Sequence, residues 1–175
     1  MSKALSRRSF LKIGVIGGLA LATAGGIYRL TRPSQAPHPF VLDDGAHSVL
    51  AAVTPVILAG ALAPDSADVQ AAIERTTGAI RQLPRRTQKE IQDMFALLAL
   101  PPARRLLAGL PDDWANAKPE DVAAFLQSWR VHRIGLLQSV YHALHELVIA
   151  PWYADESTWA SIGYPGPVKE LSGER

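Results

Sequence analysis

The chain has 175 residues, of which 48% are apolar and 19% charged, which allows one compact domain of ordinary size and hardly two. It contains no cysteine, which excludes disulfides, iron–sulfur ligation, thiol catalysis and covalent haem attachment. The formal net charge of +2 comes from residues 1–24, which hold four basic side chains and no acidic one, whereas the remaining residues hold 14 basic and 16 acidic side chains. A mildly acidic body argues against a nucleic-acid partner, which needs a basic protein surface.

The N-terminus carries the most specific motif of the chain. Residues 6–12 read SRRSFLK, and an uncharged stretch from Ile13 to Tyr28 follows. This order resembles twin-arginine export signals, whose pattern is S-R-R-x-F-L-K. Two adjacent guanidinium groups can each hold a carboxylate through two hydrogen bonds, a geometry that lysine lacks. We therefore predict an export signal whose motif residues are Arg7, Arg8, Phe10, Leu11 and Lys12.

The fate of this leader, residues 1–28, stays open between cleavage and retention. Small residues at 20–22 and 22–24 offer cleavage sites. Without cleavage, residues 13–30 would form about 27 Å of helix at about 1.5 Å per residue, which is short but sufficient for an anchor. Arg29 and Arg32 would then lie on the far side of the membrane, against the positive-inside tendency. We expect a cleaved signal peptide, with a membrane anchor as the alternative.

Proline content separates a linker from the body. Residues 29–42 contain Pro33, Pro37 and Pro39 with little periodicity, which is typical of a linker. The body that follows shows helical periodicity and no convincing strand alternation or internal repeat. We therefore predict an all-α fold, a small bundle of five or six helices over residues 43–150, between the N-terminal export signal and a C-terminal segment of residues 151–175.

Four helices are expected in the first part of the body, at 45–62, at 67–83, from Thr87 to the Pro101–Pro102 break, and at 102–108 before Gly109. Asp43 or Asp44 can cap the first helix. The second repeats its apolar side chains every three or four positions, as one helix face requires. Residues 87–90 have the capping-box pattern, in which two side chains bond to free backbone N–H groups, so the third helix should start there.

A longer helical pattern of 31 residues runs from Pro119 to Ile149 and is expected to end at Pro151. Glycine is a poor helix former, so Gly135 is a weak point in this pattern. Two helices that meet near Arg133 therefore remain the alternative to one long helix.

Aromatic residues are concentrated after residue 150, where proline and glycine also accumulate. Such a segment is not expected to form a regular helix, so we predict an extended, irregular strap that lays its rings on a surface. That surface is either the domain's own helices or a partner, and both alternatives stay open. Aromatic anchors are typical of interfaces, so the candidate partner-binding residues are Trp152, Tyr153, Trp159, Tyr164 and Pro165.

The histidines form the one cluster of candidate reactive side chains. His142, His145 and Glu146 share a helical face at i, i+3 and i+4, a spacing that can hold a metal ion. The order H-x-x-H-E differs, however, from the zinc-protease patterns H-E-x-x-H and H-x-x-E-H. We therefore predict no catalytic residue and no metal site, and keep these three residues as the alternative. The arginine pairs at 85–86 and 104–105 are expected on solvated helix faces, with contact to phospholipid head groups or to an acidic partner surface as the alternative.

Three short segments carry a resemblance to a known family. They are Phe125–Arg130 (FLQSWR), Trp152–Ala154 (WYA) and Trp159–Pro167 (WASIGYPGP). Together with the leader and the chain length, they resemble the gluconate 2-dehydrogenase subunit 3 family, the small exported helical subunits of periplasmic flavin dehydrogenases. The resemblance covers residues 43–167 loosely and the C-terminal segment more closely.

The resemblance implies that this chain has a role other than catalysis. Small subunits of that family associate with a large, leaderless, FAD-binding oxidoreductase of the glucose-methanol-choline (GMC) type and carry it across the membrane through the shared signal. This implies no cofactor in this chain, FAD in the large subunit, and the twin-arginine translocase and a haem electron-transfer protein as further partners. It also implies residence in the periplasm or at the periplasmic face of the inner membrane.

The resulting hypothesis is an accessory subunit that is not itself an enzyme and that stays bound to the dehydrogenase it escorts. Two alternatives from other classes stay open. One is a stand-alone periplasmic enzyme or metal-binding protein that uses His142, His145 and Glu146. The other is an envelope structural protein held in the membrane by an uncleaved leader.

Overall fold

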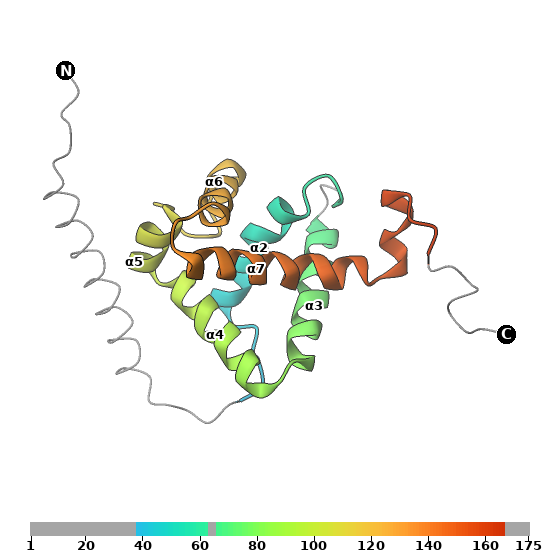
Figure 1. Cartoon of the computed structure of the whole chain (residues 1–175), viewed down its shortest axis with the longest axis horizontal. Coiled ribbons are helices and arrows are strands. Elements are labelled where there is room, and N and C mark those ends of the chain that lie inside the picture. The colour runs from blue at the N-terminus through green and yellow to red at the C-terminus, as the bar shows by residue number, and fades with distance from the viewer. Residues whose placement is uncertain (1–37, 63–65, 167–175) are drawn as a thin grey trace, which may run out of the picture. The chain divides into compact units, whose positions relative to one another are not determined.

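The computed structural model describes residues 38–62 and 66–166. The predicted export signal, most of the predicted linker and the end of the C-terminal segment lie outside the described residues. All regular structure in the described ranges is helical and packs as a small bundle, which confirms the predicted all-α class (Figure 1). In chain order the elements are α2 (Asp44–Ile57), α3 (Ser66–Gln82), α4 (Arg85–Ala99), α5 (Pro101–Ala103), η1 (Arg104–Ala108), α6 (Pro119–Arg130), α7 (Gly135–Tyr153), η2 (Glu156–Thr158) and η3 (Ala160–Ile162).

α2 is the central helix of the bundle and packs against α3, α4, α6 and α7. Asp43 caps its start by accepting a hydrogen bond from the Ala46 backbone N–H over 2.8 Å, as one of the two expected caps. The helix ends at Ile57, five residues earlier than expected, because the chain turns at residues 58–61, where Gly60 takes a φ of +87°. The apolar side chains that α2 buries completely in the core are Ala46, Val49, Leu50 and Val53.

The start of α4 differs from the predicted capping box. The helix begins at Arg85 and has no side-chain cap, so Thr87 already lies inside its first turn and is not the cap. Gln88, the second residue of the predicted box, is only 1% exposed. Its Nε2 atom donates to the backbone carbonyls of Arg81 and Leu83, over 2.9 and 2.7 Å, at the end of α3. A tertiary contact between α3 and α4 therefore takes the place of the local box.

A second glutamine on α4 joins Gln88 in fixing the segment that enters the bundle. The Phe40 backbone N–H donates to Gln88 Oε1 over 2.8 Å, and the Val41 N–H donates to Gln92 Oε1 over 3.0 Å. Gln92 Nε2 donates in turn to Asp43 Oδ2, the carboxylate that caps α2, over 3.0 Å. Phe40, predicted as part of the linker, is a buried core residue. One hydrogen-bond network, the glutamine joint, thus connects residues 40–43 with α2, α3 and α4.

The long helical pattern after residue 118 is interrupted, which confirms the alternative of two helices. α6 ends at Arg130 and α7 begins at Gly135. His132 stabilises the break: its Nδ1 atom accepts a hydrogen bond from the Ile134 N–H over 3.0 Å, and its carbonyl accepts one from Gln138 Nε2 over 2.8 Å. These two hydrogen bonds hold the turn in which the chain changes direction between α6 and α7.

The short helix expected at 102–108 is found as two consecutive elements. α5 is a single α-helical turn, and η1 continues it as a π-helix. In a π-helix the backbone hydrogen bonds join residues five positions apart, whereas those of an α-helix join residues four positions apart. Gly109 ends η1 at a φ of +70°, the left-handed region that glycine favours, as predicted.

Aromatic residues hold α6 against η1 and the end of α4. The indole N–H of Trp129 donates to the Leu107 carbonyl over 2.9 Å, and that of Trp114 donates to the Leu98 carbonyl over 2.8 Å. Phe125 packs edge-on against both indoles, with ring centroids 4.7 Å from Trp129 and 5.7 Å from Trp114. The FLQSWR segment therefore contributes its aromatic side chains to the core of this domain.

We predict that Gln88→Ala lowers the free energy of unfolding by about 2 to 4 kcal/mol, because it leaves one buried N–H and two carbonyls without partners. Urea denaturation followed by circular dichroism measures the change. The matched control is Gln127→Ala on an exposed position of α6, which should change the same quantity by less than about 0.5 kcal/mol. Equally small effects of both substitutions would contradict the role of the glutamine joint.

Candidate functional site

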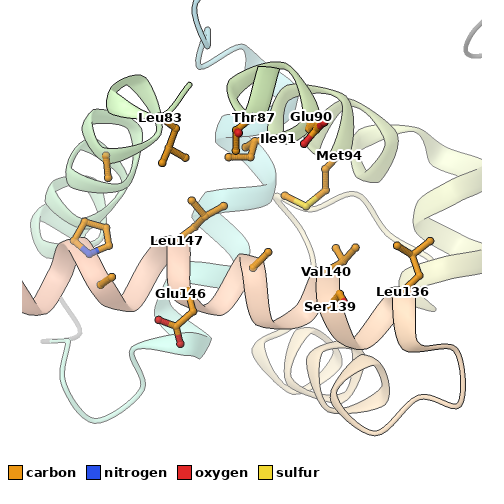
Figure 2. A pocket seen from close by; sticks show the side chains of 14 residues that line it. Leu83, Thr87, Glu90, Ile91, Met94, Leu136, Ser139, Val140, Glu146 and Leu147 are labelled. Atoms are coloured by element: carbon orange, nitrogen blue, oxygen red, sulfur yellow. The ribbon is translucent and has the colours of Figure 1, made fainter. Parts of the chain in front are cut away.

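A groove lies between α4 and α7, which both pack on α2 (Figure 2). Its volume is about 670 Å³, and its walls come from the end of α3, from α4 and from α7. Ten of its fourteen lining residues are apolar, so the groove is a water-exposed apolar surface. This apolar groove is the candidate functional site.

Most side chains that line the groove are apolar, and four are polar. Figure 2 shows Leu147 and Val140 of α7 directed towards α4, on the side where Met94 extends towards α7. The polar lining residues are Thr87, Glu90, Ser139 and Glu146. Glu146 points away from α4, so its carboxylate stands at the outer edge of the groove. The groove is therefore mainly apolar, with one glutamate on each of its two long walls.

The only charged residues that line the groove are Glu90 on α4 and Glu146 on α7. Glu90 Oε1 accepts a hydrogen bond from Arg86 Nε over 3.2 Å, and Glu146 Oε1 lies 3.9 Å from His145 Nδ1. Both glutamate side chains are more than half exposed, so water screens these pairs and they hold the carboxylates only weakly. Each wall of the groove thus presents one carboxylate that remains able to meet a cation.

The groove exists because α7 carries apolar residues on two faces. Leu144, Val148 and Trp152 form the face that is buried in the core. Val140 and Leu147 lie on the groove side and are only partly buried, and Leu136, which also lines the groove, is 70% exposed. The sequence shows that these residues are apolar and lie in a helical pattern, but it does not show which face of the helix is covered by the core and which stays open.

Trp152, a predicted partner-binding residue, packs in the domain's own core. It is 7% exposed, and the Arg75 guanidinium lies 4.8 Å from the centre of its ring. The expected end of the helix at Pro151 is wrong, because α7 continues to Tyr153. Burial of the Trp152 ring keeps this last turn packed although proline offers no backbone N–H.

The segment after α7 is irregular, as predicted, but it is coiled into the short turns η2 and η3 and is not extended. The Trp159 indole N–H donates to the Tyr153 carbonyl over 2.8 Å, and the Tyr164 ring packs edge-on against it at 5.1 Å. Gly166 takes a φ of +92°, in the region that favours glycine, and a side-chain carbon there would lie 3.2 Å from the Trp159 ring. Tyr164 is 45% exposed and Pro165 is exposed, so both remain candidate partner contacts.

Arg75 also fastens this segment through Asp155. Its Nη2 atom lies 2.8 Å from Asp155 Oδ2. The Ser157 hydroxyl and backbone N–H donate to the same carboxylate, and these hydrogen bonds, with the charge of Arg75, lower the pKa of Asp155 below its ordinary value. No local pattern relates residue 75 to residue 155, so the sequence alone does not reveal this role of Arg75.

The three candidate metal ligands are not brought together into a metal site. His145 is partly buried, whereas His142 and Glu146 are exposed. The Tyr141 ring packs against both imidazoles, with centroids 5.2 Å from His142 and 5.6 Å from His145. Within residues 38–62 and 66–166, no three His, Cys, Asp or Glu residues form a group that could hold a metal ion.

The prediction that both arginines at 104–105 lie on a solvated face is wrong for Arg104. It is only 7% exposed, and its Nε atom is buried without a hydrogen-bond partner. The reason is that η1 packs against α4 and α6, which cover one side of it. Arg105, one residue later, is exposed as expected.

Comparison of the chain with models of protein families, with curated proteins and with solved structures finds no match. In the part of the chain that the structure describes, no helix combines the length and the apolar character needed to cross a membrane. The family resemblance rests on the quoted motifs and stays an expectation.

We predict that Asp155→Asn lowers the melting temperature at pH 7 and that this difference disappears at low pH. A carboxyl group whose pKa is lower in the folded state stabilises the protein above its unfolded pKa of about 3.9. This stabilisation is lost as the pH falls through the lower, folded-state pKa. Melting curves between pH 7 and about pH 2 measure the effect.

The matched control for this prediction is Asp112→Asn, an exposed loop carboxylate. Its melting temperature should follow the wild type at every pH. A difference between Asp155→Asn and the wild type that does not change with pH would contradict the proposed role of the Asp155 charge.

Proposed function

We propose that this protein is a non-catalytic accessory subunit that binds a leaderless, flavin-dependent dehydrogenase of the GMC type. It escorts the dehydrogenase through the twin-arginine pathway and stays bound to it in the periplasm or at the periplasmic face of the inner membrane. The observation that carries the proposal is the apolar groove between α4 and α7. Apolar surface is costly to leave in water, so a second polypeptide that covers the groove gains free energy from its burial.

The make-up of the groove favours a protein partner. Protein interfaces combine an apolar, desolvated centre with polar residues, and the groove combines ten apolar lining residues with four polar ones. Tyr164 and Pro165 add an exposed aromatic residue and a rigid neighbour, both typical of contact surfaces.

The sequence motifs supply the identity of the partner in this proposal. The SRRSFLK motif supports export of a folded cargo, and the WASIGYPGP segment supports the likeness to small subunits of flavin dehydrogenases. The partner then contributes FAD and the substrate site, while this chain contributes the export signal and the docking surface. Electrons leave the flavin of the partner for a haem electron-transfer protein.

We predict that the affinity-tagged chain brings down a yellow partner with the absorbance spectrum of a flavin. We also predict that the double variant Arg7→Lys with Arg8→Lys retains both this chain and its partner in the cytoplasm. The lysine variant keeps the charge but loses the paired guanidinium geometry of the signal. Cell fractionation followed by immunoblotting measures both locations. A colourless chain purified alone, or a partner that still reaches the periplasm, contradicts the escort function.

We also predict that Ala143→Trp weakens the complex at least about tenfold, because an indole on the exposed groove side of α7 occupies the space for the partner. Its free energy of unfolding should change by less than about 0.5 kcal/mol, since Ala143 is exposed. Ala123→Trp, at an exposed position of α6 outside the groove, is the matched control and should bind normally. Biolayer interferometry with the purified partner measures both affinities, and equal values for the two variants count against the groove.

A further inference from the structure

The apolar groove is built from two helix faces. On α7 its lining residues recur from Leu136 to Pro151 at intervals of three or four residues, which is one face of the helix over about 22 Å at about 1.5 Å per residue. On α4 they recur from Thr87 to Met94 at the same intervals. α4 and α7 both pack on α2 but diverge from each other. The space between two such faces suits the ridges of a third helix.

The polarity of the groove selects a helix over an extended segment. An extended peptide brings unpaired backbone N–H and C=O groups, and each one that is buried without a partner costs free energy. The groove offers few partners for them, because only four of its fourteen lining residues carry polar side chains and one of these, Ser139, already donates its Oγ hydrogen to the Gly135 carbonyl over 3.0 Å. A helix satisfies its own backbone groups and presents only side chains.

The charges of the groove select the chemistry of that helix. The charged lining residues, Glu90 and Glu146, are both acidic and stand on opposite walls. Arg86 is bonded to Glu90, but its side chain is 90% exposed, so this pair is weak and can exchange for a partner cation. His145 stands 3.9 Å from Glu146 on the same helix. A helix with an apolar stripe and a basic residue on each side of it complements this surface.

We propose that the groove between α4 and α7 binds an amphipathic helix whose apolar stripe is flanked on both sides by lysine or arginine. The inference rests on the proposed function for the source of that helix, which is an exposed segment of the escorted dehydrogenase. The apolar stripe supplies the affinity by covering the middle of the groove. The flanking cations fix the orientation of the helix through Glu90 and Glu146.

The test uses the purified full-length chain and a labelled synthetic helix of about 18 residues, with a leucine stripe and lysine on both sides of it. Fluorescence anisotropy measures its affinity. We expect saturable binding to the wild type, at least about tenfold weaker binding to Ala143→Trp, and about three- to tenfold weaker binding to Glu90→Gln with Glu146→Gln. The same peptide with glutamate in place of lysine should bind at least about tenfold more weakly.

Matched controls separate the groove from general attraction to an acidic protein. Ala123→Trp adds the same indole to α6, and Glu120→Gln with Asp121→Asn removes two exposed acids from the first turn of α6. Both controls should bind the lysine peptide as the wild type does. Equal affinity for the two peptides, or equal losses in the groove variants and their controls, overturns the inference.

The lysine peptide added to the purified complex separates this inference from the proposed function. Displacement of the flavoprotein by the lysine peptide and not by the glutamate peptide supports both. If the chain forms a stable complex with the flavoprotein but its groove does not prefer the lysine peptide to the glutamate peptide, the escort function stands and the helix-binding groove is overturned. Groove-dependent peptide binding by a chain that brings down no flavoprotein supports the groove and overturns the escort function.

Discussion

The buried amides of Gln88 and Gln92 are the constraint on which the arrangement of the helices depends. Each amide has two donor hydrogens and one acceptor oxygen, so one side chain can join several segments at a fixed distance. Gln88 uses its amide to join the segment at Phe40 to the end of α3, and Gln92 joins the segment at Val41 to the cap of α2. Because both lie on α4, the start of the folded body, α2 and α3 are all tied to a single helix.

The glutamine joint fixes one of the two long walls of the groove, α4, and has no member on the other wall, α7. α4 is fixed at its start to the end of α3 and packs along α2, while α7 packs against α3 and α6. α4 and α7 both pack on α2 but do not pack against each other, so in the described part of the chain the apolar residues that face the space between them remain open. Among residues 38–62 and 66–166, no element covers the whole of the second apolar face of α7, and this open apolar surface supports binding of another polypeptide.

Polar side chains also decide how the C-terminal segment is held. The Arg75 guanidinium contacts the Trp152 ring on one side and the Asp155 carboxylate on the other, and so joins α3 to the end of α7 and to the turn after it. Trp159, Tyr164 and Gly166 then pack on one another. Only part of the aromatic segment remains exposed to a partner, because one of its two tryptophans completes the core and the other packs within the segment.

Local rules in the sequence determined the helical class and the place of most helices. The apolar spacing located α3 to within one residue at each end, and glycine ended η1 at position 109, because both effects act between residues a few positions apart. The sequence also supplied the export motif and the candidate partner-binding residues of the aromatic C-terminal segment. Only the tertiary structure decided that Gln88 is a core residue, that Arg104 is covered, that Trp152 faces inward and that one apolar face of α7 is open. Those outcomes depend on contacts between residues far apart in the chain, such as Phe40 and Gln88 at a separation of 48 residues, and periodicity records that a side chain is apolar without recording which neighbour covers it.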